Sequence, residues 1–455
     1  MKKIYYLKSS LFIAFSFLIL LMASCKKDKP SETLAAPVIS YTPATVSYID
    51  ETTITPLTPT NTGGAVSSYS INTPLPAGLL FDTTTGIISG TPTTLSSATT
   101  YKITATNATG SVTTSIVLTV NPVAPTGLGL YEADSSIYKV LIVAVSKIGT
   151  QTFDYGLVFD TGSGGMVIDA SGILPASMIT SSGFNFSGDS TVVNGITITN
   201  QVDSIEYGAD SATFSTVYGN LAYAAITTGD QGENVVVKRL PFFIYYKAVD
   251  ANGKTYGAHE FDVFGVNEEY DVTFANNAYI TSPFVYFTPG AGLTRGFKMA
   301  ALGATNFSYD GTYAPGVVSL GLTPTDVSSL SGFTMSQLYY YAGDGYAPII
   351  PATITYGSKH FSTDVLFDTG TEPYSFIEDP TFNGNTTLLP VNTSVSVSTT
   401  SGFSLNYTTT ATENLTYVEN PNISGGNISI IGLEYFLNNE YMLNFDSHKL
   451  GLKVN

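Results

Sequence analysis

The sequence predicts an all-β protein, with a small N-terminal β-sandwich followed by a larger, two-lobed β domain. Only 12% of the 455 residues are charged, 42 are glycines, and short runs alternate apolar residues with Thr and Ser. Alternation with a period of two is typical of half-buried strands, and no long amphipathic helical pattern occurs. One apolar strand ending in Asp-Thr-Gly is present twice. This repeat predicts two related lobes.

The first 24 residues have the pattern of a bacterial signal peptide. Three lysines in the first eight residues precede an apolar stretch, Leu11 to Met22, that is too short to span a bilayer. The stretch ends in Leu21-Met22-Ala23-Ser24-Cys25, which resembles a lipobox. The resemblance implies lipidation of Cys25 and a tether at 25–35 similar to that of Bacteroidetes-type lipoproteins. We therefore expect a cell-envelope protein, anchored to the outer membrane on its periplasmic or surface-exposed face.

Composition excludes several function classes. Cys25 is the only cysteine, so the exported domains contain no disulfide and depend on a large β core for stability. A formal net charge of −17 excludes a basic nucleic-acid surface and favours a solvated acidic exterior. His259, His360 and His448 have no metal-ligand spacing, so we expect surface positions and no bound metal. No cofactor motif is found, and we expect a monomer.

Residues 36–122 are predicted to form the N-terminal β-sandwich. The segments Leu75–Asp82 and Thr85–Pro92 resemble the signature of Ig-like domains on bacterial surface proteins. Two later segments alternate with a period of two and are predicted as the last strands, Tyr101–Thr106 and Ile116–Val120. A Pro-containing linker is expected at 123–129.

The remaining chain contains the two Asp turns. Leu157-Val158-Phe159-Asp160-Thr161-Gly162-Ser163 recurs as Val365-Leu366-Phe367-Asp368-Thr369-Gly370-Thr371. Two such turns can bring two carboxylates face to face, where like charges cannot both ionise and one proton is shared. Glycine permits the sharp turn, and the hydroxyl residue after it can hydrogen-bond the carboxylate. A pair of this kind serves as acid and base at once.

At these residues the chain resembles the pepsin-like aspartic proteases. Further segments extend the resemblance from about 130 to 455, in the family's order: Lys147–Phe153, Phe261–Val266, Ser429–Leu437 and Tyr441–Leu452. It implies a β-barrel acid-protease fold with an N-lobe at about 130–285 and a C-lobe at about 286–455. It also implies an aspartic endopeptidase that hydrolyses polypeptides.

The resemblance assigns a role to each residue of the two motifs. Asp160 and Asp368 would activate a water between them. The supporting residues would join the turns to each other or orient the carboxylates: Thr161, Gly162, Ser163, Thr369, Gly370 and Thr371. Gly265 and Gly432 would lie on the strands that pass behind the two Asp loops.

A flap over the cleft is expected at Ser204–Ser211, with Tyr207 and Gly208 as its functional residues. The chain has no Trp, and Val167 occupies about the place of the Trp that supports the flap tyrosine in the family. We therefore expect Tyr207 to be less well fixed. Ala209 and Asp210 depart from the usual flap tip, and Glu372 would raise the shared pKa of the pair if it faces the cleft.

Three functions are compatible with these motifs. The first is a lipid-anchored endopeptidase. The second is a non-catalytic binding or adhesion lipoprotein whose cleft holds a peptide or glycan. The third, an Ig-rich structural surface protein, leaves the paired motifs unexplained. Both Asp turns are intact, which favours the enzyme.

Overall fold

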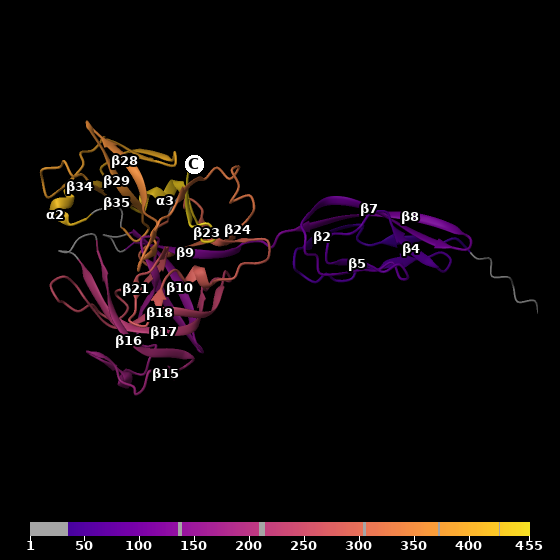
Figure 1. Ribbon diagram of the computed structural model, residues 1–455, viewed down its shortest axis with the longest axis horizontal. Coiled ribbons are helices and arrows are strands. Elements are labelled where there is room, and N and C mark those ends of the chain that lie inside the picture. The colour runs from indigo at the N-terminus through magenta and orange to yellow at the C-terminus, as the bar shows by residue number, and fades with distance from the viewer. Residues whose placement is uncertain (1–34, 135–138, 209–213, 304–305, 372–373, 427) are drawn as a thin grey trace, which may run out of the picture. The chain divides into compact units, whose positions relative to one another are not determined.

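The computed structural model describes residues 35–134, 139–208, 214–303, 306–371, 374–426 and 428–455 (Figure 1). These residues divide into two compact units, one ending at Asn121 and the other beginning at Pro122. The expected signal peptide, Cys25 and most of the tether lie outside the described residues. Among the described helices, none has the length and apolar character needed to cross a membrane.

The first unit is a small β module. Its main sheet has the order β2-β8-β7-β4, with β2 parallel to β8. The strands predicted at 101–106 and 116–120 lie within β7 and β8. The module has its own core, in which Ile88, Ile103 and Ile116 are fully buried. The strands are β1 (Ile39–Tyr41), β2 (Thr45–Ile49), β3 (Pro59–Asn61), β4 (Ser68–Ile71), β5 (Leu79–Phe81), β6 (Ile88–Gly90), β7 (Ser96–Asn107) and β8 (Gly110–Asn121).

The second unit contains a large sheet that begins in the first lobe. Its order is β15-β16-β17-β18-β12-β19-β11-β10-β9-β24-β23-β36-β37-β25, and a further pairing of β10 with β17 closes the first part on itself. The strands are β9 (Thr126–Asp134), β10 (Lys139–Ile148), β11 (Gln151–Asp160), β12 (Gly164–Asp169), β15 (Ser190–Val193), β16 (Ile196–Tyr207), β17 (Ser215–Thr228), β18 (Val235–Val249), β19 (Val263–Val266), β23 (Thr294–Met299), β24 (Thr312–Leu322), β25 (Thr334–Gln337), β36 (Asn439–Asn444) and β37 (Lys449–Val454).

The second lobe has a sheet of its own, in the order β31-β34-β30-β35-β29-β28-β32-β33. In β28 every second residue is buried, as expected for a strand with one face on the core. The strands are β28 (Ile350–Tyr356), β29 (Lys359–Phe367), β30 (Ser375–Glu378), β31 (Thr386–Leu388), β32 (Ser394–Thr399), β33 (Ser404–Thr408), β34 (Thr416–Glu419) and β35 (Ile428–Ile431).

The remaining elements are short. They are β13 (Ile179–Thr180), β14 (Gly183–Phe184), β20 (Glu268–Glu269), β21 (Val272–Thr273), β22 (Tyr279–Ile280), β26 (Tyr340–Tyr341), β27 (Gly345–Tyr346), the 3-10 helices η1 (Ala176–Met178) and η2 (Pro283–Tyr286), and the α-helices α2 (Pro421–Ser424) and α3 (Glu434–Asn438). The longest of these helices has five residues. The prediction of an all-β protein is therefore confirmed.

The same strand arrangement occurs once in each lobe. In the first, β11 runs parallel to β19, which pairs antiparallel with β12, and β12 runs parallel to β18. In the second, β29 runs parallel to β35, which pairs antiparallel with β30, and β30 runs parallel to β34. The repeated sequence motif thus corresponds to a repeated strand topology.

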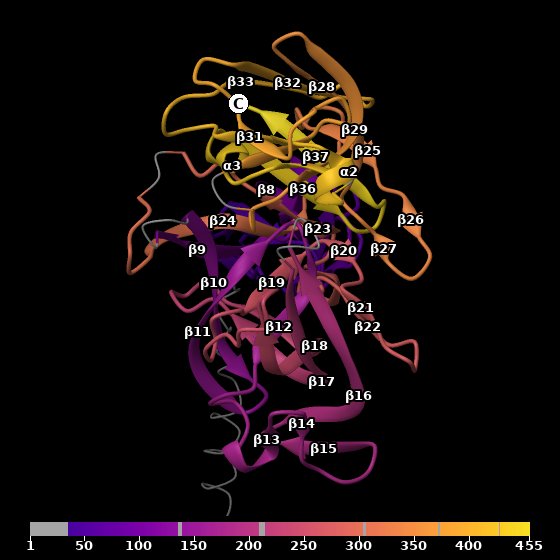
Figure 2. The ribbon, with the colours of Figure 1, turned by 90° about the vertical axis from the view of Figure 1, so that its left-hand side faces the viewer.

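Two expected boundaries need correction. β9 begins at Thr126, so the linker expected at 123–129 is too long: Leu128 and Leu130 are fully buried and belong to the sheet. The expected lobe boundary near 285 does not separate the sheets either. β23, β24, β36 and β37 continue the sheet of the first lobe, and Figure 2 shows them between the β10–β18 strands and the β28–β35 strands.

Candidate active site

The two Asp turns are positioned by buried apolar strands. Leu157 and Phe159 of β11 are fully buried, and the parallel register with β19 places Asp160 opposite Gly265. β29 ends at Phe367, which is also fully buried, and the next amide, that of Asp368, donates to the carbonyl oxygen of Ile431 at 2.9 Å. Because the apolar residues of each strand are buried in the core, the position of the Asp at the end of the strand is fixed.

In the first turn, two donors hold the carboxylate of Asp160. The Gly162 amide donates to Oδ1 at 2.6 Å, and the Ser163 hydroxyl donates to Oδ2 at 2.6 Å. Hydrogen bonds to both oxygens fix the plane of the carboxylate and favour its charged form. The Ser163 hydroxyl is thus positioned to orient the carboxylate.

The second turn repeats this arrangement. The Gly370 amide donates to Oδ1 of Asp368 at 2.8 Å, and the Thr371 hydroxyl donates to Oδ2 at 2.5 Å. Asp368 is 7% exposed, so its carboxylate meets solvent only at the cleft. The two turns present equivalent carboxylates from two different lobes.

The turns approach each other so closely that only glycine fits beside the carboxyl groups. A Cβ atom on Gly162 would lie 2.5 Å from Cγ of Asp368, and a Cβ atom on Gly370 would lie 2.7 Å from Cγ of Asp160. Burial, the charge of Asp368 and a hydrogen bond with Asp368 raise the pKa of Asp160 well above its usual range. The pair is thus suited to keep one shared proton.

Thr161 and Thr369 connect the turns behind the carboxylates. Their hydroxyls and amides bond across the lobes, with Thr161 Oγ1 donating to the Phe367 carbonyl at 2.9 Å and Thr369 Oγ1 donating to the Phe159 carbonyl at 2.7 Å. Gly265 and Gly432 lie close behind the two turns. A Cβ atom on Gly265 would lie 2.6 Å from the Ser163 hydroxyl oxygen, and a Cβ atom on Gly432 would lie 2.2 Å from the Tyr374 carbonyl oxygen.

A cleft of about 780 Å³ opens over the two carboxylates. Residues from both lobes line it, including Asp160, Gly162 and Ser163 from the first and Asp368, Gly370 and Thr371 from the second. No Lys, Arg or His is among its described lining residues. Its other carboxylate-bearing residues are Glu206, Glu260, Asp262, Glu269, Asp271 and Asp344.

Tyr207 lies at the end of β16 and lines this cleft together with Gly208. Its hydroxyl donates to Oδ2 of Asp271 at 2.8 Å, and its ring centroid lies 5.3 Å from that of Phe261. We expected Tyr207 to be less well fixed without a Trp, but Asp271 supplies a hydrogen bond that the buried Val167 cannot. Burial raises the pKa of Tyr207 well above its usual value, and the charge of Asp271 adds to this rise.

Asp271 is the site residue that the sequence analysis missed. Besides Tyr207, it accepts a hydrogen bond from the Gly164 amide, at 2.9 Å to Oδ1. Burial raises its pKa to about 7, although both hydrogen bonds act in the opposite direction. The available signal was the acidic run of residues 268–271, directly after the strand predicted behind the first Asp loop. Residues Ala209, Asp210 and Glu372 lie outside the described residues.

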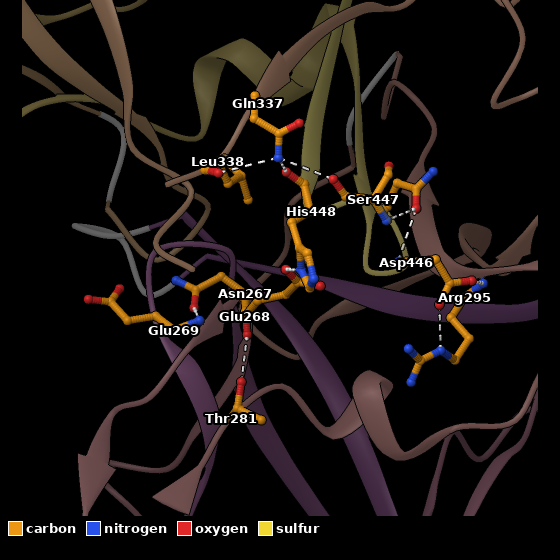
Figure 3. Close-up of polar contacts among 11 residues, drawn as sticks. Asn267, Glu268, Glu269, Thr281, Arg295, Gln337, Leu338, Asp446, Ser447 and His448 are labelled. Carbon is orange, nitrogen blue, oxygen red and sulfur yellow. Dashed lines mark hydrogen bonds and ion pairs between the residues drawn. The ribbon is translucent and has the colours of Figure 1, made fainter. Parts of the chain in front are cut away.

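His448 lies at the surface with its side chain 37% exposed, but it has a specific partner that the sequence did not predict. Its Nδ1 lies 2.8 Å from Oε2 of the buried Glu268, and its ring stacks on that of Tyr346. The Gln337 side-chain amide donates to the His448 carbonyl at 2.9 Å; Figure 3 shows His448 between Gln337 and Glu268. Burial raises the pKa of Glu268 to about 8 and lowers that of His448. The pair joins the start of the 268–271 segment to the C-terminal hairpin.

His259 is partly exposed, with 23% of its side chain accessible, whereas His360 is exposed. His259 Nδ1 lies 2.7 Å from Oδ2 of the buried Asp262, and this hydrogen bond raises the pKa of the imidazole. Its Nε2 lies 2.7 Å from the Ser171 carbonyl oxygen. Within the described residues, no cluster of three or more His, Cys, Asp or Glu side chains has the geometry to hold a metal ion.

The fold and the site define a nearly all-β protein in which an Ig-type module precedes a two-lobed unit with one Asp-Thr-Gly turn in each lobe. Residues 36–121 match the family described as "Putative Ig domain". The chain is also similar in structure to basic 7S globulin from soybean, with 11% identity, a TM-score of 0.42 and coverage of 73% of this chain and 97% of that one. A protein named edgp is similar at 12% identity and a TM-score of 0.42, covering 73% and 95%. Among curated proteins, none matches this sequence.

Proposed function

We propose that this protein is an aspartic endopeptidase, exported and anchored in the bacterial cell envelope through a lipid on Cys25. The observation that supports catalysis is the paired geometry of Asp160 and Asp368. The two carboxylates come from equivalent turns, accept equivalent hydrogen bonds and lie within one cleft. The raised pKa of Asp160 supports a pair that retains one shared proton.

In the proposed reaction, a water held between the carboxylates attacks the carbonyl carbon of a peptide bond. The ionised carboxylate takes a proton from this water, and the protonated carboxyl donates to the carbonyl oxygen. The tetrahedral species then returns a hydroxyl proton to the pair, and the amide nitrogen receives a proton as the C–N bond breaks. The ordered turns supply preorganisation, since neither carboxylate has to reorient during these transfers.

Cleavage of an unfolded polypeptide by the purified mature protein tests this proposal. We expect faster cleavage at acid than at neutral pH, and inhibition by pepstatin, whose hydroxyl imitates the tetrahedral species. Asp160→Asn and Asp368→Asn should each remove nearly all turnover and leave the fold intact. Asp364→Asn is the matched control. Asp364 is an exposed residue of β29, the strand that ends just before Asp368, and it does not line the cleft. This control should keep wild-type activity.

The second candidate is a binding or adhesion protein that holds a peptide or glycan in the cleft without cutting it. The acidic lining of the cleft supports it, because carboxylates can hold cationic groups without any chemical step. Binding of pepstatin or peptides without cleavage, from acid to neutral pH, would replace the enzyme proposal with this one.

A further inference from the structure

One carboxylate in the cleft connects the flap strand to the first Asp turn. Asp271 accepts the Tyr207 hydroxyl on Oδ2 at 2.8 Å and the Gly164 amide on Oδ1 at 2.9 Å. Gly164 is the residue after Ser163, whose hydroxyl holds Asp160. Asp271 is therefore bonded directly to the flap tyrosine. It is also linked to Asp160 through two hydrogen bonds, by way of the adjacent residues Gly164 and Ser163.

The remaining contacts of Tyr207 leave the hydroxyl without another fixed partner among the described residues. Its ring packs on Phe261 and against the buried cluster that contains Val167 and Ile205. These contacts are apolar and restrain the ring, whereas Asp271 is the one described residue that hydrogen-bonds the hydroxyl. A hydrogen bond to a carboxylate is stronger and more directional than such packing.

We propose that Asp271 is the positioning residue of the flap: its carboxylate joins the Tyr207 hydroxyl to the Gly164 amide and so holds the end of β16 over the first Asp turn. Any effect of Asp271 on catalysis rests on the proposed function, but its effect on the position of Tyr207 and the end of β16 does not. Asp271 accepts one hydrogen bond on each oxygen, and both bonds are strongest when the carboxyl is ionised. Protonation would put a donor on one oxygen and compete with the Tyr207 hydroxyl.

Charges around Asp271 define how this contact depends on pH. Burial raises the pKa of Asp271 to about 7. The pKa of Glu269 is also raised to about 7, by burial and by the charges of Asp271 and Asp344. Asp160 is the other carboxylate that acts on Tyr207. No cationic side chain lines the cleft among the described residues, so nothing there offsets these charges. The flap contact should therefore be strongest above pH 7.

Hydrogen–deuterium exchange of the amides at the end of β16 measures this contact without any catalysis. All variants carry Asp160→Asn, which also prevents self-digestion, and each is compared with that parent at pH 5 and pH 8. At pH 8, Asp271→Asn should lower protection about tenfold, because a charge-assisted hydrogen bond is lost. At pH 5 the difference should be much smaller, since the parent is then protonated at Asp271 and resembles the amide.

Asp344→Asn is the matched control, because it removes a charge from the same cleft without a bond to Tyr207 or Gly164; it should leave flap protection unchanged. Tyr207→Phe should match Asp271→Asn, and the double variant should be no worse than either. Equal protection in the parent and Asp271→Asn at pH 8, or additive effects, would overturn the proposal. If Asp271→Asn fails to fold, Tyr207→Phe decides by itself: unchanged protection at pH 8 refutes the contact.

A kinetic arm with an intact Asp160 separates the two proposals. Asp271→Asn should lower kcat/KM about tenfold at the neutral end of the pH profile and have little effect at the acid end. Complete lack of cleavage by the wild-type chain would refute the proposed enzyme, whereas the exchange experiment would still decide the role of Asp271.

Discussion

Thr161 and Thr369 exchange hydrogen bonds across the two lobes: the amide of each donates to the hydroxyl of the other, both at 3.0 Å. Each hydroxyl donates in turn to a carbonyl of the opposite strand, and both threonines are fully buried. Neither lobe can complete this set alone. The relative position of Asp160 and Asp368 is therefore fixed by residues that do not themselves face the cleft.

Replacing Thr161 by Val should destabilise the protein and reduce its activity. The valine has nearly the same shape but leaves the Thr369 amide and the Phe367 carbonyl without their partner in a dry environment. We expect the free energy of unfolding to fall by about 1–3 kcal/mol, measured by chemical denaturation. Thr161→Ser keeps the hydroxyl and should lose much less. Equal losses in the two variants would show that packing of the methyl group, and not the hydrogen bonds, holds the turns together.

Gly162→Ala should abolish cleavage while leaving much of the fold intact. The added methyl group would lie 2.5 Å from Cγ of Asp368, so the carboxylates must separate. Activity assays combined with pepstatin binding measure this effect, and both should fail together. Gly110→Ala is the control, because the nearest neighbour of an added Cβ atom there lies at 4.0 Å in the Ig-type module. Retained pepstatin affinity in Gly162→Ala would contradict the close approach of the turns.

The unfolding free energy should fall between about pH 4 and pH 7. The folded pKa values of Glu269 and Asp271, each about 7, lie above the unfolded values near 4, so the folded state holds more protons in this window. The stability that these groups contribute is complete below pH 4 and is lost as pH rises through 7. A rise of about three pKa units corresponds to about 4 kcal/mol for each group, so we expect a loss on the order of several kcal/mol. Asp271→Asn should flatten the profile, whereas the exposed Asp364→Asn should not.

Cys25→Ala should abolish fatty-acid labelling of the protein when it is expressed in a bacterial host. Only a thiol can accept the diacylglyceryl group, and Cys25 is the only cysteine of the chain. Metabolic labelling with a clickable fatty acid, followed by gel analysis, measures the attachment. Ser24→Ala serves as the control and should remain labelled. Unchanged incorporation in Cys25→Ala would reject the anchor and with it the proposed location.

The Asp turns could be predicted from sequence because each is a local unit: a buried strand, a turn glycine and a hydroxyl residue within seven positions. Asp271 could not be found this way. Its partner Tyr207 lies 64 positions earlier, and only the packing of β16 against the segment after β19 brings the two together. The pairing of His448 with Glu268 was missed for a similar reason. Glu268 and His448 are 180 positions apart, so no local pattern indicates that their side chains pair.

The C-terminal hairpin has a consequence for the order in which the chain can fold. β9 pairs with β24, β24 with β23, and β23 with β36, which begins only at Asn439. During synthesis from the N-terminus, β23 therefore has an open edge until β36 has emerged. Such long-range pairing slows folding, and an open edge invites contacts with other chains. A chain truncated before β36 would keep that edge permanently, so we expect the truncation to cause aggregation and not merely a shortened second lobe.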